Sequence, residues 1–269
     1  MRYFFHIGYN GIAYNGWQKL PQANSIQQII ETTLSKLLKK NITIVGCGRT
    51  DAKVHATQFF FHVDIEMPWE FDMLFRINKN LPPDIAVFDV IAMDGLQHAR
   101  FDAIKRTYDY FIHTYKDPFL NNVSAPYQEK NLNIFKMKEA VSLLTQYDDY
   151  RAFCRNFTNH RTTICKISSA SLYVDSLGDR LRFNISANRF LSGMIRIIVQ
   201  RLLHVGTHKL TVDEFEQFLI SKEPPKMNEP AYPQGLFLSK VTYPFLDLPP
   251  RAAFSNIPVN ESTQWQLVE

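Results

Sequence analysis

One short loop carries the residues with the clearest chemical potential in the sequence. It runs from Gly46 to Ala56, reads Gly-Cys-Gly-Arg-Thr-Asp-Ala-Lys-Val-His-Ala, and is called the Asp51 loop below. Arg49 stands two residues before Asp51, and a nearby guanidinium favours the ionised form of a carboxyl group. Asp51 is therefore a candidate nucleophile or electrostatic anchor rather than a general acid. A salt bridge within the loop is the simpler interpretation of this pattern alone, so the remaining sequence has to decide.

A second charged candidate stands in an apolar segment. The run Met194–Ile198 is apolar except for Arg196, and its periodicity predicts a helix over residues 189–204. An arginine costs free energy when it is buried without a partner. Two interpretations stay open: the side chain reaches solvent at the helix edge, or it meets an acid or a phosphate in a cleft. Asp51 is the obvious candidate acid.

Cations and aromatic residues lie close together in the middle of the chain. The segment Gln97–Phe101 is basic and aromatic, and Tyr108 follows two cations at the start of a predicted strand. A strand tyrosine is more often a packing residue than a platform for a base, and a single surface cation is usually solvated. Together these cations could line a basic cleft that binds nucleic acid through its phosphates. They are Arg100, Lys105, Arg106, Arg155, Arg161 and Arg196.

Composition and motif content exclude several classes of protein. The 269 residues carry a net charge of +4, which slightly favours polyanionic partners. The 3 cysteines form no Cys-x-x-Cys pair, which fits a reducing cytoplasm. The sequence has neither the apolar region of a signal peptide nor an apolar run of about 18 residues. Histidines are scattered, and the glycines match no dinucleotide or phosphate-loop motif, so we expect no metal and no cofactor.

Periodicity and helix caps predict an α+β fold in two similar halves. Each half is expected to contain strand, helix, strand, strand, helix and strand in that order. Ser25 with Gln28 and Thr211 with Glu214 are expected capping boxes at two helix starts. The expected elements of the first half are residues 3–8, 26–38, 42–45, 58–65, 69–79 and 84–93. Those of the second half are a strand from 105, a helix over 137–144, a hairpin of 164–174 and 181–187, helices over 189–204 and 211–220, and a strand over 236–243.

Each half would be a split βαβ sheet of the ferredoxin or RRM type, backed by helices. The two halves would meet in a basic central cleft. We expect residues 1–100 to form an N-terminal half that carries the Asp51 loop. Residues 101–247 would form the C-terminal half, and residues 248–269 a loosely attached extension, because they show no periodic pattern.

A set of short motifs, in order from residue 14 to residue 238, resembles the TruA-type tRNA pseudouridine synthases. Each motif is weak alone, and it is their order and spacing that carry the resemblance. The motifs are Tyr14-Asn15-Gly16-Trp17-Gln18, Gly48-Arg49-Thr50-Asp51-Ala52, Val54-His55-Ala56, Asn80-Leu81-Pro82, His98-Ala99-Arg100-Phe101, Arg106-Thr107-Tyr108, Met194-Ile195-Arg196 and Gly235-Leu236-Phe237-Leu238.

The resemblance implies an isomerase that converts uridine to pseudouridine in tRNA, usually in the anticodon arm, without metal or cofactor. Asp51 would be the catalytic aspartate that attacks the target nucleotide, paired with Arg196. Tyr108 would pack on the target base and help to remove a proton, and Arg49 would contact RNA as the base is extruded. Such enzymes are typically homodimers. Segments that contact tRNA would supply His98, Arg100, Phe101 and Arg161.

One departure from the resembling sequences lies inside the Asp51 loop. Where they usually have glycine, this chain has Lys53. If that position needs a positive φ, a lysine strains the loop; otherwise it adds a cation beside the RNA. A tRNA-binding paralogue that has lost catalysis is therefore an alternative hypothesis. A hydrolase of a small anionic substrate is a weaker third, because no second carboxylate is paired with Asp51.

Overall fold

The computed structural model describes most of the chain, and the protein is α+β, as the sequence predicts. Among the residues described, no helix is long and apolar enough to cross a membrane. The described residues are 1–66, 69–129, 131–225, 228–251 and 265–268.

The described residues form two compact units that do not follow the chain in order. Unit 1 contains residues 1–106 and 237–251, and unit 2 contains residues 107–236 and 265–268. Strand β9 (Leu236–Thr242), which we expected in the second half, pairs in parallel with β3 (His55–Asp64). The chain therefore returns to its first unit after building its second, through a long-range strand pairing that no local pattern encodes.

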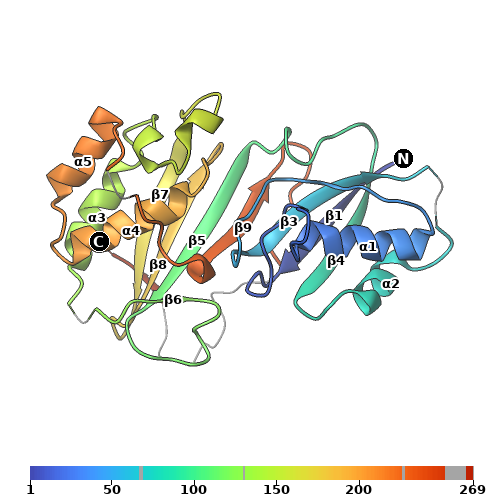
Figure 1. The fold of residues 1–269 in the computed structure, drawn as a ribbon, viewed down its shortest axis with the longest axis horizontal. Coiled ribbons are helices and arrows are strands. Elements are labelled where there is room, and N and C mark those ends of the chain that lie inside the picture. Colours follow the sequence, from blue (N-terminus) through green and yellow to red (C-terminus); the bar gives the residue numbers. More distant parts are fainter. Residues whose placement is uncertain (67–68, 130, 226–227, 252–264, 269) are drawn as a thin grey trace. The chain divides into compact units, whose positions relative to one another are not determined.

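Unit 1 is a sheet with two helices on one face (Figure 1). The strand order is β9, β3, β1, β4, with the short β2 also paired to β3. Strand β1 runs antiparallel to both β3 and β4. Besides β3 and β9, the elements are β1 (Arg2–Tyr9), α1 (Ile26–Leu38), β2 (Val45–Gly46), α2 (Met73–Asn80) and β4 (Ile85–Met93).

Aromatic side chains hold the two central strands of unit 1 together. Phe5 lies opposite Phe61 and His6 lies opposite Phe60 in the β1–β3 register. Each pair of rings stacks with centroids 4.8 Å apart. Cross-strand pairs of this kind contribute roughly 0.2–1 kcal/mol each. The aromatic-rich sequence thereby fixes the register of β3, the strand that follows the Asp51 loop.

Unit 2 is built on the antiparallel hairpin of β7 (Ile167–Asp175) and β8 (Arg180–Ala187). Strand β5 (Lys105–His113) lies next to β8. Three helices gather beside the hairpin in Figure 1. These helices are α3 (Ile134–Leu143), α4 (Met194–Gly206) and α5 (Val212–Ser221). The short elements are β6 (Ala125–Pro126), the 3-10 turns Arg151–Phe153, Phe157–Asn159 and Pro233–Gly235, and β10 (Trp265–Leu267).

The expected C-terminal extension needs correction at its end. Residues 252–264 lie outside the described residues. Trp265–Leu267 form β10, which pairs antiparallel with β7 instead of hanging loosely. The Trp265 ring lies 5.9 Å from the Phe111 ring, and the Arg180 guanidinium lies 5.4 Å from the centre of the indole. The contact of Trp265 with the buried Phe111 ring and the pairing with the edge of β7 therefore hold a segment that has no periodic sequence pattern.

Other local expectations also differ from the structure. Helix α2 begins at Met73 rather than near residue 69, with Asp72 as its N-cap. Helix α4 begins at Met194 rather than near residue 189, because Gly193, with φ of 70°, forms its N-cap. The strand expected over residues 42–45 is reduced to Val45–Gly46. The backbone N–H groups of Ile42 and Ile44 donate to side chains of α1 (Ser35 at 2.9 Å and Glu31 at 3.2 Å), so helix side chains replace a neighbouring strand.

The two helix starts predicted from capping residues are confirmed. The Ser25 hydroxyl accepts a hydrogen bond from the backbone of Gln28 at the start of α1. At the start of α5, the backbone of Glu214 donates to the Thr211 hydroxyl at 3.1 Å. The backbone of Thr211 donates in return to the Glu214 carboxylate at 2.8 Å. This reciprocal box satisfies donors that a helix leaves unpaired at its first turn.

We predict that Thr211→Ala lowers the free energy of unfolding by about 1 kcal/mol, because the first turn of α5 loses its cap. Urea denaturation followed by circular dichroism measures this change. Thr32→Ala, at an exposed position on α1, is the control and should be neutral or slightly stabilising, because alanine favours helices. Equal midpoints for wild type and Thr211→Ala would contradict the prediction.

Candidate active site

The Asp51 loop leaves β2 and enters β3, and its backbone is closely tied to unit 1. The Cys47 N–H donates to the Phe60 carbonyl at 2.7 Å, and the Val54 N–H donates to the Asp51 carbonyl at 3.2 Å, which closes a turn. The Asp51 side chain is half-buried, whereas Arg49 and Lys53 on either side of it are exposed. The loop thus presents a carboxylate between two cations at a fixed point of the backbone.

The segment before α1 braces this loop on both sides of Asp51. The Trp17 N–H donates to the Thr50 carbonyl at 3.2 Å, and the Lys53 N–H donates to the Tyr14 carbonyl at 3.1 Å. The Tyr9 and Thr50 hydroxyls also form a hydrogen bond of 2.9 Å. The backbone is therefore held both before and after Asp51, which limits the positions that its carboxylate can take, and a reacting group benefits from such restraint.

A glycine allows this close approach. Gly16 has φ of 89°, and a Cβ there would lie 2.3 Å from the Thr50 carbonyl oxygen and 2.9 Å from the Asp51 carbonyl carbon. Real Cβ atoms do not come so close to backbone atoms, and a positive φ strains any residue with a Cβ. The Tyr14–Gln18 motif therefore works through its backbone, with the glycine as the contact point.

Helix α1 anchors the bracing segment. The N–H groups of Ile26 and Gln27, at the first turn of α1, donate to the carbonyls of Gly16 and Trp17 at 3.1 Å and 3.0 Å. A helix start normally leaves such donors unpaired. Helix α1, which the sequence predicts clearly, thus positions the segment Tyr14–Trp17, called the brace below, and the brace positions the Asp51 loop.

Arg106 joins the Asp51 loop to the basic and aromatic segment. Its Nη2 atom donates to the Cys47 carbonyl at 2.7 Å and to the Arg100 carbonyl at 2.9 Å, and Nη1 donates to the Ala103 carbonyl at 3.3 Å. A guanidinium has five donors in a fixed plane, so one side chain can hold three carbonyl groups. From the sequence we expected Arg106 to be one of the cations of a basic cleft; in the structure its guanidinium holds backbone carbonyl groups.

The segment after β4 is a tight turn organised by His98. The His98 Nδ1 atom accepts hydrogen bonds from the backbone N–H groups of Arg100 at 3.1 Å and Phe101 at 3.2 Å. The backbone N–H of His98 donates to the Asp102 carboxylate at 2.7 Å. Phe101 is 74% exposed, and its ring stacks on the His98 ring at 4.2 Å. An exposed ring beside an exposed guanidinium is a suitable platform for an unstacked base.

A buried histidine of β3 supports the same turn. The Ala99 N–H donates to His62 Nδ1 at 3.1 Å, and the Tyr243 hydroxyl donates to the Ala99 carbonyl at 2.6 Å. Burial, together with the positive charge of Arg2 and the nearby His98, lowers the pKa of His62 to about 4. The ring is therefore neutral at neutral pH, as an acceptor at Nδ1 requires.

The chemistry of the loop points to its carboxylate. Burial raises the pKa of Cys47 to about 11, so its thiol stays protonated at neutral pH and is a poor nucleophile. Within the described parts of the chain, no group of three or more His, Cys, Asp or Glu residues could hold a metal ion. Asp51 therefore remains the candidate nucleophile of the loop.

Unit 2 holds the other predicted site residues. Tyr108 lies on β5, half-buried, with its ring edge-to-face with Phe190 at 5.2 Å. Arg196 on α4 is also half-buried, and its Nε donates to the Ala231 carbonyl at 2.7 Å. Arg161 is exposed in the loop before β7. Asp51 belongs to unit 1, so its pairing with Arg196 and the basic cleft between halves stay predictions.

Arg201, which the sequence reasoning overlooked, is the buried arginine of α4. It is 5% exposed and lies between the rings of Phe153 and Phe218, each centre 4.2 Å from the guanidinium carbon. Its Nη2 donates to the Ala152 carbonyl at 2.7 Å and to Asn228 at 2.9 Å. Burial lowers its pKa to about 9, so it stays charged at neutral pH. The apolar residues around Arg201 in the sequence, Ile197–Val199 and Leu202–Leu203, could have indicated that it is buried.

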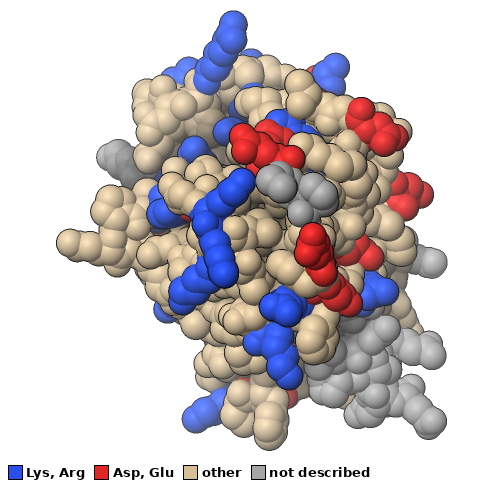
Figure 2. Space-filling view, turned by 90° about the vertical axis from the view of Figure 1, so that its right-hand side faces the viewer, with Lys and Arg blue, Asp and Glu red and all other residues tan. Residues whose placement is uncertain are grey.

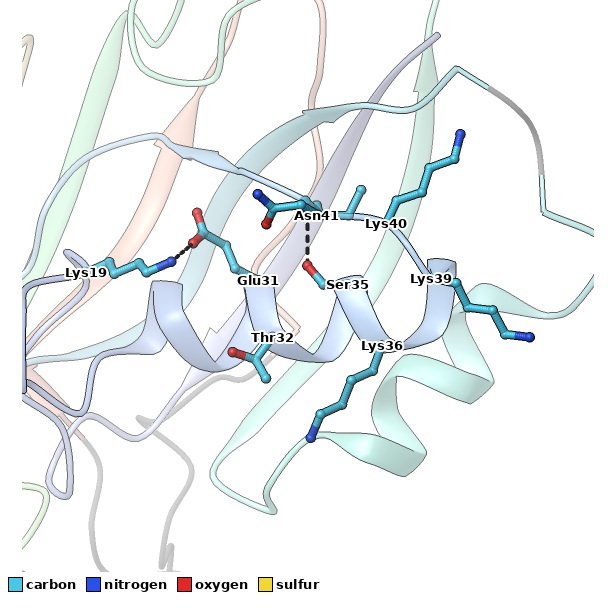
Figure 3. Close-up of a pocket in the computed structure, with 9 residues that line it drawn as sticks. Lys19, Glu31, Thr32, Ser35, Lys36, Lys39, Lys40 and Asn41 are labelled. Atoms are coloured by element: carbon cyan, nitrogen blue, oxygen red, sulfur yellow. Dashed lines mark hydrogen bonds and ion pairs between the residues drawn. The ribbon is translucent and has the colours of Figure 1, made fainter.

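A hollow of about 520 Å³ lies elsewhere on unit 1, beside α1 (Figure 3). Lys36, Lys39 and Lys40 line it, but Figure 3 shows their side chains pointing in different directions rather than toward a common centre. Lys19 is paired with Glu31 at 3.0 Å. Figure 2 views the side of unit 1 that carries the N-terminus and shows acidic side chains next to the basic ones. Lys36, Lys39 and Lys40 therefore do not converge on one point.

Comparisons with known proteins agree with the motifs. A family model described as tRNA pseudouridine synthase matches residues 142–244. The tRNA pseudouridine synthase A of Porphyromonas gingivalis is 38% identical over 246 residues, which cover 90% of this chain and 97% of the relative. Proteins of the same name from Bacteroides fragilis and Idiomarina loihiensis are 40% and 35% identical, covering 90% and 91% of this chain and 96% and 94% of the relatives.

Identity of this extent, together with an α+β fold that carries a braced aspartate loop, defines the class as the pseudouridine synthases. Within that class, the chain belongs to the tRNA pseudouridine synthase A family. The resemblance identified from the ordered motifs is thereby confirmed.

We predict that Gly16→Ala lowers the free energy of unfolding by roughly 2 kcal/mol or more, because strain at φ of 89° adds to a backbone clash. Hydrogen exchange at Thr50–Val54 should also become faster. Gly178→Ala is the matched control: Gly178 has φ of 76°, but a Cβ there meets nothing within 4 Å. In the control, only the backbone strain should lower the free energy of unfolding, by about 1 kcal/mol. Equal losses in the two variants would contradict the proposed contact.

We predict that acidification weakens the turn at Ala99. The pKa of His62 is about 4 in the folded chain, whereas its ordinary value is 6.5. Between pH 6.5 and pH 4, His62 is therefore protonated in the unfolded chain but not in the folded chain. Stability is fully present above pH 6.5 and falls as the pH drops toward 4. Urea midpoints across this range measure the slope, which His62→Gln should reduce. An unchanged slope in the variant would assign the effect to other groups.

Proposed function

We propose that this protein converts uridine to pseudouridine in the anticodon stem-loop of tRNA, with Asp51 as the nucleophile. Family membership makes the chain an isomerase that acts on tRNA. The observation that carries the finer proposal is the Asp51 loop. Hydrogen bonds hold its backbone on both sides of Asp51, whose half-buried side chain stands between two exposed cations in the sequence. An aspartate carboxylate at such a position is a suitable nucleophile for covalent catalysis.

The reaction requires the target base to leave the RNA stack. Unstacking costs a few kcal/mol, which aromatic stacking and phosphate contacts offset. Asp51 attacks the ribose of the target nucleotide as the bond from the ribose to uracil N1 breaks, and the released base rotates. A bond from the ribose to C5 then forms as the bond to Asp51 breaks, which regenerates the carboxylate. The C5 proton is then lost and N1 gains a proton, so the product is an isomer and no redox partner is consumed.

We assign the remaining predicted residues to binding and proton removal. Tyr108 packs on the target base and assists loss of the C5 proton. Arg49 contacts the RNA beside the extruded base, and Arg196 pairs with Asp51. The four residues assigned to contacts with the rest of the tRNA are His98, Arg100, Phe101 and Arg161.

We also propose that the protein acts as a homodimer in the cytoplasm, where its substrate would be found. The alternative function is a tRNA-binding paralogue without catalysis. It is favoured by one observation, the non-glycine residue with positive φ in the Asp51 loop, Lys53. A paralogue of this kind binds tRNA in a salt-dependent way and forms no pseudouridine.

We predict that Asp51→Asn lowers pseudouridine formation by at least about 10³-fold while tRNA binding survives, because the variant loses its nucleophile and keeps its shape. Release of tritium from tRNA labelled at uridine C5 measures turnover, and filter binding measures affinity. Asp94→Asn, an exposed carboxylate in the turn after β4, is the matched control and should keep full activity.

Two results would decide against the proposal. Turnover by Asp51→Asn at the wild-type rate would remove Asp51 as the nucleophile. Binding of tRNA without product from the wild-type protein would favour the paralogue, and chemical mapping of pseudouridine in unmodified tRNA would identify the site if product forms.

A further inference from the structure

Lys53 has a backbone conformation that a lysine adopts at a cost. Its φ is 64°, and the Val54 N–H donates to the Asp51 carbonyl at 3.2 Å, so Ala52 and Lys53 are the central residues of a turn. Ala52 has a negative φ and Lys53 a positive one, the signs of a type II turn. Glycine is the residue that fits the second central position without crowding of Cβ.

The other lysines with positive φ have a different explanation. Lys39 and Lys222 are the C-caps of α1 and α5, and His208 directly follows the C-cap of α4. A left-handed residue commonly ends a helix, because it lets the last carbonyls find donors. Lys53 ends no helix. Its conformation is imposed by the brace, since its N–H donates to the Tyr14 carbonyl at 3.1 Å.

No internal contact of the side chain offsets this strain. Lys53 is exposed, and in the part of the chain that the structure describes its ammonium group has no hydrogen bond, ion pair or ring contact. Strained residues persist at positions where function requires them. We therefore expect the ammonium group to bind a partner outside the protein. Because Lys53 follows Asp51 by two residues, that partner would lie beside Asp51.

We propose that Lys53 binds a phosphate of the RNA strand next to the target nucleotide. This inference rests on the proposed function, because it places the strand beside Asp51. Arg49 precedes Asp51 by two residues and Lys53 follows it by two, and both are exposed. A pair of cations flanking the nucleophile neutralises backbone charge on either side of the extruded nucleotide. Lysine suits this task, because its ammonium is a point charge on a flexible stem.

The test separates strain from charge with four variants. Lys53→Gly removes both, Lys53→Ala removes the charge and keeps most of the strain, and Lys53→Arg keeps the charge. Lys39→Gly is the matched control: Lys39 is also an exposed lysine with positive φ, 53°, but it caps the far end of α1. Each protein is titrated with unmodified tRNA at several salt concentrations, and its thermal midpoint and turnover are measured.

Both glycine variants should raise the thermal midpoint, by about 1–3 °C, because each relieves one strained residue. Lys53→Gly and Lys53→Ala should weaken tRNA binding by about 3- to 10-fold and reduce the slope of log affinity against log salt by about 0.7, the loss of one phosphate contact to a single strand. Lys53→Arg and Lys39→Gly should bind within about twofold of wild type.

Wild-type affinity and salt slope in Lys53→Gly and Lys53→Ala would overturn the inference. An equal loss in Lys39→Gly would also overturn it, because the effect would then follow net charge alone. Failure of the proposed function gives a different result: the wild-type protein forms no pseudouridine. The binding titrations do not depend on turnover, so they decide the role of Lys53 in that case as well.

Discussion

The structure of the candidate site depends on backbone hydrogen bonds between two loops, the Asp51 loop and the segment before α1. Thr50 and Lys53, on either side of Asp51, each bond to that segment, which in turn caps the first turn of α1. A nucleophile on an unrestrained loop would lose much of the advantage of orientation, which can amount to several kcal/mol of the barrier. The same restraint explains why Lys53 keeps a strained φ, since the loop cannot relax without releasing the brace.

Polar backbone groups of the surrounding turns are satisfied by the side chains of Arg106, which is half-buried, and His62, which is buried, rather than by strand partners. Arg106 holds the carbonyls of Cys47 and Arg100 with one nitrogen, and His62 accepts the Ala99 N–H. Irregular backbone near a site must pair its N–H and C=O groups in this way, because unpaired buried groups are costly. The aromatic and basic surface at Phe101 is consequently presented on a rigid turn.

Local patterns predicted those parts of the fold that local interactions stabilise. The caps at Ser25 and Thr211 mark helix starts, because the capping side chain and its partner are three residues apart. Patterns of this kind did not predict that β9 pairs with β3, or that Trp265–Leu267 pair with β7. These contacts join segments far apart in the sequence. The pairing is stabilised by hydrogen bonds to the edge of the partner strand, and that edge exists only after folding.

The sequence by itself identified an aspartate between two cations, the motifs around it, and the family to which they belong. It also identified Arg196 as unusual, although the deeply buried arginine of α4 is Arg201. Only the tertiary structure decided that Gly16 contacts Thr50, that Arg106 clamps carbonyls, and that Lys53 is strained. The reason is physical: a residue type fixes what a side chain can do, whereas backbone angles and burial depend on neighbours that only folding brings together.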